Sequence, residues 1–322
     1  MKLKKIIFPV IALAVIAAAA IYFFGSSSDD YYEDDYDDYY EDDYDYDYEE
    51  YNYESNKQNK PVSSVTSKNT HRFSSLGSAA ELKGNTVIVT IFADDKKTFW
   101  GNNSESLKND TLKYLTIATN WLAKNAENYG SQVNFIYDWQ KNPDLYYAGK
   151  INTVLTSDDM DGATWKYIDS TIDTAGLMEK YNAQNILYLC MVNTPSNNSI
   201  TSCTTAYTSD LPYQYEICYM YVNLSGKQEP PSAYAHEILH TFGAPDLYME
   251  DTDGYNFGIT KEYVSWCKKN SSNDIMYTIY DRNDKPVYNS IINEFTELDA
   301  YYVGLSKKSD EVQKWKLGRT QH

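Results

Sequence analysis

Two histidines four residues apart carry the chemistry that this sequence is best equipped to perform. His236 and His240 lie one turn apart on the same face of a predicted helix, so both imidazoles can reach one metal ion. Gly243 lets the chain turn sharply after this helix, and Asp246 then supplies a carboxylate oxygen. Two imidazoles and one carboxylate leave a fourth tetrahedral position open, as catalytic zinc requires. We therefore predict one Zn²⁺ ion held by these three ligands.

Glu237 follows the first ligand, where its carboxylate can reach a water molecule in the open position. As a general base it would take the proton of that water and pass it to a leaving amine. The other histidines, His71 and His322, stand in a polar segment and at the last position, so neither is a convincing third ligand. The alternative is an ordinary helix with two surface histidines, but the glycine and aspartate at fixed offsets make that coincidence rare.

Residues 236–246 resemble the zinc-binding motif of the metzincin metallopeptidases, with aspartate in place of the third histidine. Residues 243–248 resemble the corresponding segment of the immune-inhibitor-A-type peptidases, which are secreted bacterial enzymes. Residues 273–277 resemble the Met-turn, in which a methionine, here Met276, packs beneath the ligand imidazoles; an ordinary core methionine is the alternative. The resemblance implies an α+β, two-lobed peptidase domain with a twisted mixed sheet, a backing helix, an active-site helix and a C-terminal helix.

The same resemblance implies an activity, a tyrosine and a substrate-binding strand. The activity is that of a zinc endopeptidase whose partners are protein or peptide substrates. Many metzincins carry a tyrosine two residues after the methionine, where it stabilises the developing oxyanion. That position is Thr278 here, and the flanking Tyr277 and Tyr280 are the candidates. The edge strand before the active-site helix binds extended substrate in this family, which indicates residues 199–208; a plain surface strand is the alternative.

Two other functions are compatible with the motif. A zinc-binding surface module could serve adhesion or partner binding without catalysis, although an intact Glu237 argues against it. A zinc amidase could act on cell-wall material, because the motif does not specify which amide bond is cut. Product analysis on cell-wall fragments and on unfolded protein would separate the two enzymes.

The N-terminal residues predict export. Residues 1–5 carry three lysines, and residues 6–24 are almost entirely apolar. At 1.5 Å per residue this stretch spans about 28 Å, enough to cross the hydrocarbon core of a membrane. We predict a single-pass signal anchor in the cell membrane, with a cytoplasmic N-terminus and an extracellular body. A cleaved signal peptide followed by secretion is the alternative.

An acidic segment follows the predicted anchor. Residues 29–54 hold 15 acidic residues, 10 tyrosines and no lysine or arginine, so the net charge of −18 falls to 28 − 31 = −3 without them. Charge repulsion predicts that residues 25–54 form a disordered tether; cation binding or docking to a basic partner is the alternative. An acidic exported chain is a poor candidate for nucleic-acid binding, which needs basic patches.

Residues 55–84 predict a linker, and residues 85–322 predict one peptidase domain, which we expect to be monomeric. Apolar runs and helical spacing predict the elements that position the motif. The predicted strands are residues 86–92, 133–137, 186–192, 200–207 and 217–222. The predicted helices are residues 104–129, residues 163–182, a motif helix that starts near Ala233 with Ser232 as its N-cap, and residues 290–303.

The cysteines and one acidic loop are further candidates for disulfides and for a calcium site. The four cysteines are Cys190, Cys203, Cys218 and Cys267. In an oxidising compartment they permit two disulfides in three pairings, of which Cys203–Cys218 is favoured because both flank a short hairpin-like excursion; free buried thiols are the alternative. Residues 250–254 form a weak calcium-like cluster without EF-hand spacing, so we predict a solvated loop there.

Overall fold

The computed structural model describes residues 79, 81–101, 104–157, 160–194, 201–205, 216–223, 225–251 and 257–318. They belong to one compact unit of the chain. The predicted anchor, the acidic tether, most of the predicted linker, His71 and His322 lie outside the described residues. Within the described part, no helix combines the length and the apolar character needed to span a membrane.

The described unit has an α+β fold built on a six-stranded mixed sheet. The strands are β1 (Gly84–Asp94), β2 (Val133–Ile136), β3 (Tyr146–Lys150), β4 (Asn185–Val192), β5 (Cys203–Thr205) and β6 (Ile217–Tyr221). The strand order is β2-β1-β4-β6-β5, and β3 pairs with the second half of β1. All pairs are parallel except β5, which runs antiparallel to β6 at the edge of the sheet. The mixed sheet and the edge position of β5 confirm two expectations from the sequence.

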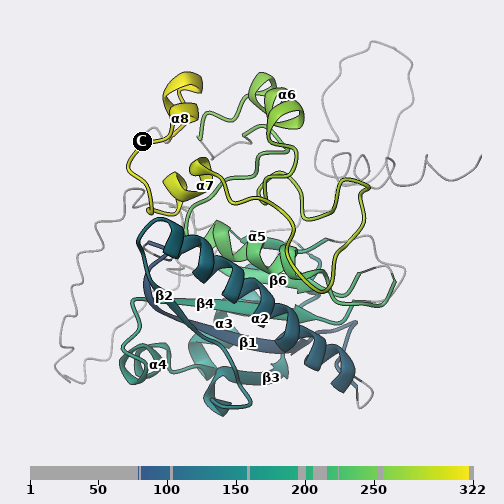
Figure 1. The fold of residues 1–322 in the computed structure, drawn as a ribbon. Coiled ribbons are helices and arrows are strands. Elements are labelled where there is room, and N and C mark those ends of the chain that lie inside the picture. Colours follow the sequence, from purple (N-terminus) through teal and green to yellow (C-terminus); the bar gives the residue numbers. More distant parts are fainter. Residues whose placement is uncertain are drawn as a thin grey trace, which may run out of the picture. The chain divides into compact units, whose positions relative to one another are not determined.

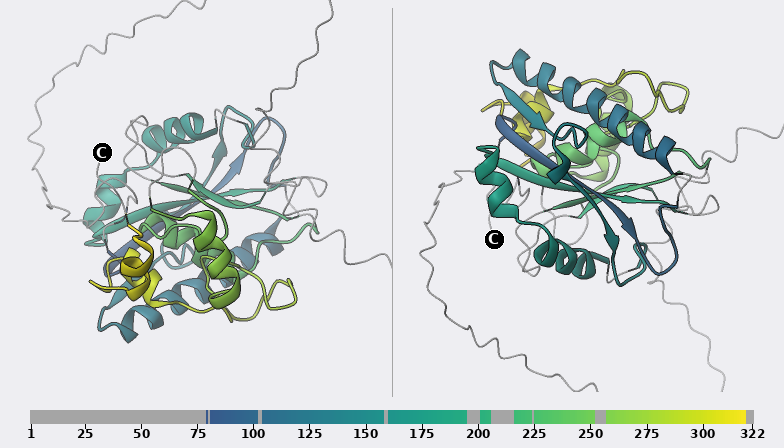
Figure 2. Two further views of the ribbon diagram at one scale, coloured as in Figure 1. Left: turned by 90° about the horizontal axis from the view of Figure 1, so that it is seen from above. Right: turned by 90° about the horizontal axis from the view of Figure 1, so that it is seen from below.

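Helices cover both faces of this sheet (Figures 1 and 2). Helices α2 (Glu105–Asn128) and α5 (Pro231–Thr241) lie on one face, and α3 (Met160–Thr171) and α4 (Thr174–Lys180) lie on the other. Every residue of β4 is buried, and its side chains alternate between the two cores. This is why the strand is a continuous apolar run, since parallel strands covered on both sides need no polar face.

After α5 the chain is mostly irregular and carries three short helices. These are α6 (Lys261–Asn270), α7 (Glu297–Tyr302) and α8 (Asp310–Trp315), and they lie beyond α5 as seen from the sheet (Figure 1). The residues before β1 are tied to this region, because Ala79 N donates to Thr241 O at 2.9 Å and Leu82 N donates to Val303 O at 3.0 Å. The folded unit therefore includes residues upstream of 85.

The helix boundaries differ from the sequence prediction in two places. Residues 163–182 form two helices, because Asp173 accepts a hydrogen bond from Gly176 N at 3.0 Å and so starts α4 as a new helix. The predicted helix over residues 290–303 is reduced to α7, since Thr296 and Asp299 form a capping box that fixes its start. Helices α6 and α8, strand β3 and the 3-10 turn η1 (Pro143–Leu145) were not predicted.

The motif helix also begins differently. Its N-cap is Pro230 and its first residue is Pro231. Proline lacks an N–H, but an N–H at the first position of a helix has no acceptor within the helix, so no hydrogen bond is lost. Ser232 lies inside the helix and is not the cap; its hydroxyl donates to Ile279 O at 2.5 Å and ties α5 to the segment after the predicted Met-turn. The start of α5 is therefore held by a tertiary contact and not by a capping side chain.

The predicted Cys203–Cys218 disulfide is wrong. All four cysteines are free thiols. In the register of β5 on β6, Cys203 lies opposite Tyr219 and Thr204 lies opposite Cys218. Neighbouring positions in a strand point to opposite faces, so the two thiols cannot meet. The alternative of free thiols is confirmed, and three of the four are buried.

Candidate metal centre

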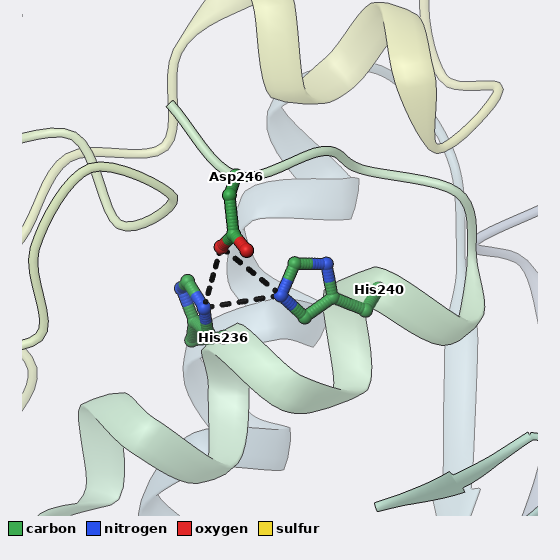
Figure 3. Close-up of side chains that lie close together, drawn as sticks. All are labelled: His236, His240 and Asp246. Atoms are coloured by element: carbon green, nitrogen blue, oxygen red, sulfur yellow. Dashed lines mark hydrogen bonds and ion pairs between the residues drawn. The ribbon is translucent and has the colours of Figure 1, made fainter. Parts of the chain in front are cut away.

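His236, His240 and Asp246 converge on one point (Figure 3). The histidines come from successive turns of α5, and the aspartate comes from the loop that follows it. The two Nε2 atoms are 3.1 Å apart, and Asp246 Oδ1 lies 3.2 Å from His236 Nε2 and 3.3 Å from His240 Nε2. Within the described residues this is the one cluster of three side chains that could hold a metal ion. The structure thus brings together all three predicted ligands.

Backbone carbonyls fix the outer nitrogen of each imidazole. His236 Nδ1 lies 2.9 Å from Ile275 O, and His240 Nδ1 lies 2.8 Å from Ala244 O. A carbonyl oxygen only accepts, so each Nδ1 must donate its hydrogen, and a neutral ring then carries its lone pair on Nε2. Two lone pairs therefore face each other and Asp246 Oδ1, which is buried and accepts no hydrogen bond from the part of the chain that the structure describes. Such a set of donors repels itself unless a cation lies between them, so it can hold a metal.

Without a metal, a proton is the cation that these side chains can share. Burial disfavours the imidazolium of His240, but the charge of Asp246 outweighs burial and raises the pKa of His240 to about 9. Burial acts against the carboxylate of Asp246, but the two histidines lower the pKa of Asp246 well below its usual range. A metal ion would displace this proton, because only the neutral imidazole binds it.

The segment 273–277 connects the two parts of the centre. Ile275 O holds the ring of His236, and Met276 O accepts from Leu247 N at 2.9 Å, one residue after the aspartate ligand. Asp274 Oδ1 accepts from Met276 N at 2.8 Å and stabilises the turn. The side chain of Met276 is fully buried in the same core as the apolar residues of α5. The predicted Met-turn therefore positions both the helix and the ligand loop through its backbone.

Glu237 lies beside the ligands and is only 5% exposed. Its Oε2 atom is 2.9 Å from the hydroxyl of Thr204, on edge strand β5. Burial is the main cause that raises the pKa of Glu237, and the charge of Asp246 adds to it, while the histidines and Thr204 oppose the shift. Thr204 fell within the predicted edge strand, but nothing in the sequence connected it to the motif glutamate.

The tyrosine next to the ligands is Tyr248, which the sequence did not single out. Its ring stacks on His236 with centroids 6.3 Å apart and planes 25° apart, although 49% of the residue is exposed. Burial of its hydroxyl and then the charges of Asp246 and Glu237 raise the pKa of Tyr248, so it keeps its proton. The only available signal was its position in the Asp-Leu-Tyr run of the motif segment.

The two tyrosines proposed from the resemblance lie in other surroundings. Burial and then the thiol of Cys267 raise the pKa of Tyr277. Burial raises the pKa of Tyr280 to about 12, with a further contribution from Glu229. Tyr248 is the tyrosine whose ring stacks on a ligand, His236, so we expect it to be the phenol that a substrate meets first.

The acidic loop after the ligands has a structural role where it is described. Asp251 Oδ2 accepts from Gly258 N at 2.7 Å and from Ile259 N at 3.0 Å, and Glu250 is exposed. Asp253 and Gly254 lie outside the described residues. The part of this loop that is described holds its own backbone together.

No protein-family model matches this chain, and no curated protein matches it significantly. The chemistry of the centre is therefore argued from its own atoms. Three electron-pair donors that meet beside a buried carboxylate can bind a divalent cation and handle a proton next to it.

Proposed function

We propose that this chain is a zinc-dependent metallopeptidase of the metzincin type, which hydrolyses peptide bonds outside the cell and is held at the membrane by its N-terminal segment. The observation that carries the proposal is the convergence of His236, His240 and Asp246 with both Nδ1 hydrogens tied to carbonyls. The buried carboxylate of Glu237 beside them supplies the base that hydrolysis needs.

The donor set fits zinc. Zinc ligands at about 2.0–2.1 Å in a tetrahedron lie about 3.3 Å from one another. The three donor separations are 3.1, 3.2 and 3.3 Å. Two imidazole nitrogens and one carboxylate oxygen are also the donors of hydrolytic zinc sites. A bound zinc ion would lower the pKa of a water molecule toward neutrality and polarise a carbonyl.

The remaining roles belong to side chains of the chain itself. Glu237 accepts a proton from the attacking water and gives it to the leaving amine, while the hydroxyl of Thr204 holds its carboxylate in place. The phenol of Tyr248 stays protonated and donates a hydrogen bond to the oxygen of the scissile carbonyl. In the described sheet β5 pairs on one side only, with β6, so its other edge offers N–H and C=O groups to an extended peptide.

The test is turnover of a mixed peptide library by the full-length, zinc-loaded chain in detergent, followed by mass spectrometry. We expect cleavage that a zinc chelator abolishes and that Glu237→Gln reduces at least about 100-fold, because the general base is removed. Zinc content should stay unchanged in this variant. Glu250→Gln, at an exposed glutamate, is the control. Equal turnover by Glu237→Gln would refute the assigned base, and absence of cleavage by the parent chain would refute the peptidase.

A further inference from the structure

A second buried carboxylate stands in the segment that leads into α5, the helix that carries the proposed base. Glu229 is 7% exposed and precedes α5, yet it does not cap this helix, because the start of α5 has no side-chain capping bond. Among the described residues its carboxylate accepts no hydrogen bond and pairs with no lysine, arginine or histidine, and it is not wholly closed off from water. A buried carboxylate without a partner is costly, so its burial calls for an explanation other than stability.

Glu229 is influenced by a second carboxylate and by two phenols, and the cation of Lys227 lies 5.7 Å from the ring centroid of one of them, Tyr288. Burial and then the charge of Glu237 raise the pKa of Glu229 to about 7. The charge of Glu229 in turn acts on the phenols of Tyr280 and Tyr288, both of which are half-buried. Carboxylates beside aromatic rings are the groups that recognise ammonium and guanidinium ions.

The position of Glu229 suits the binding of a substrate residue near the cleavage point. From Pro231 to Glu237 the helix rises about 9 Å, at about 1.5 Å per residue. An extended peptide covers this distance in about three residues, at about 3.3 Å each. A substrate whose scissile bond lies at Glu237 and which runs along α5 toward its first residue would bring a nearby side chain, or its own N-terminus, to the segment that carries Glu229.

We propose that Glu229 forms the base of a subsite for a positively charged group of the peptide substrate, either a lysine or arginine side chain or the α-ammonium group. This inference rests on the proposed peptidase function and adds the class of substrate. The cation replaces the missing partner of the buried carboxylate, and the phenols of Tyr280 and Tyr288 complete its surroundings.

The experiment measures peptide binding without turnover. The zinc-loaded full-length chain with Glu237→Gln is titrated against fluorescent peptides that differ at one position, which is lysine, norleucine or acetyl-lysine. Each peptide is used with a free and with an acetylated N-terminus, which separates the two sources of charge. We expect the charged peptide to bind at least tenfold more tightly than its neutral counterpart. Adding Glu229→Gln should abolish this difference, and adding Glu250→Gln should preserve it.

The possible failures are distinguishable. Equal binding of charged and neutral peptides would overturn the subsite and leave the peptidase proposal intact, as would a preference that survives Glu229→Gln. Absence of binding by any peptide, with no turnover by the parent chain, would remove both proposals. If Glu229→Gln fails to fold by circular dichroism, the comparison of lysine with norleucine at low and high salt in the Glu237→Gln chain decides the question.

Discussion

At the scale of single residues, the metal centre depends on atoms that face away from it. The carbonyls of Ile275 and Ala244 hold the outer nitrogens of the two histidines, so both inner nitrogens present lone pairs to Asp246. Side chains with two alternative tautomers are thereby restricted to the one that binds a metal. The site is organised for a cation before any cation arrives.

Asp246 is the ligand that the chain can least replace. Within the described residues no other acidic or histidine side chain joins the two histidines. We expect Asp246→Ala to weaken zinc binding at least about 100-fold, since loss of a mere supporting contact to a ligand already costs about 10–100-fold. Competition with a chromophoric chelator measures the affinity, with Glu250→Ala as the control. Retention of full zinc affinity would place the third ligand elsewhere in the chain.

Tyr248 offers a test of which phenol assists the reaction. Tyr248→Phe keeps the ring that stacks on His236 and removes only the hydroxyl. Loss of one donor to a developing oxyanion lowers kcat about 100-fold. We expect kcat to fall by this factor while KM and the zinc content stay unchanged. Steady-state kinetics and metal analysis measure these quantities. Tyr277→Phe should remain close to the parent chain. If Tyr277→Phe or Tyr280→Phe loses kcat instead, the oxyanion donor is the one that the metzincin resemblance implies.

At the scale of secondary-structure elements, α5 is the frame of the site. Its start is formed by two prolines, the N-cap Pro230 and the first residue Pro231, and all of its residues except His240 are buried. Gly243 has a φ of 101°, a backbone conformation that lets the chain reverse and bring Asp246 back over the helix. Thr204 then links β5 to Glu237. The base and the ligands are therefore placed by elements that come from separate parts of the sequence.

The turn over residues 273–277 and helix α7 each carry a buried carboxyl group. Asp274 and Asp299 are each 1% exposed. Burial raises the pKa of both groups, and the charge of Asp274 raises the pKa of Asp299 further. A carboxyl group whose pKa is raised on folding contributes stability while it is protonated, and this contribution is lost as the pH rises through its folded pKa. The support of the metal centre is therefore sensitive to pH.

We expect the free energy of unfolding of the parent chain to fall as the pH rises from about 4 toward neutrality, by at most about 1.4 kcal/mol per pH unit for each such proton. Asp274→Asn carries no charge and keeps an oxygen for Met276 N, so its unfolding energy should depend less on pH. Urea denaturation at several pH values, with a chelator present to exclude metal effects, measures the slopes. Asp169→Asn, on an exposed part of α3, should leave the slope unchanged. Identical slopes in all three chains would contradict the raised pKa of Asp274.

At the scale of the whole molecule, charge and fold are distributed unevenly along the chain. Fifteen of the 46 acidic residues lie in residues 29–54, outside the described unit. Within that unit the ligands come from the helix that covers the sheet and from the loop after it, while their supports come from the irregular C-terminal part. The metal centre lies where these two regions meet. This arrangement is compatible with the two lobes that we expect for a metzincin-like peptidase.

The sequence by itself determined the features that depend on local geometry. The spacing of His236 and His240 follows from the pitch of a helix, and Asp246 lies within reach after one glycine turn. The buried strands were evident because a short continuous run of apolar residues is typical of a strand that is covered on both faces of a sheet. Helix ends were less evident, because Asp173 and Thr296 act as caps only when the flanking chain takes the required backbone angles.

Only the tertiary structure decided which distant groups serve the ligands. Ile275 O and Thr204 reach the centre from other segments, each more than 30 residues from the group it contacts. A carbonyl oxygen has no signature in sequence, and a threonine or glutamate has many equivalent copies along the chain. The register of β5 on β6 likewise decided that Cys203 and Cys218 stay apart. Such contacts depend on how elements pack, and packing is set by the sum of many weak apolar contacts that no single residue reveals.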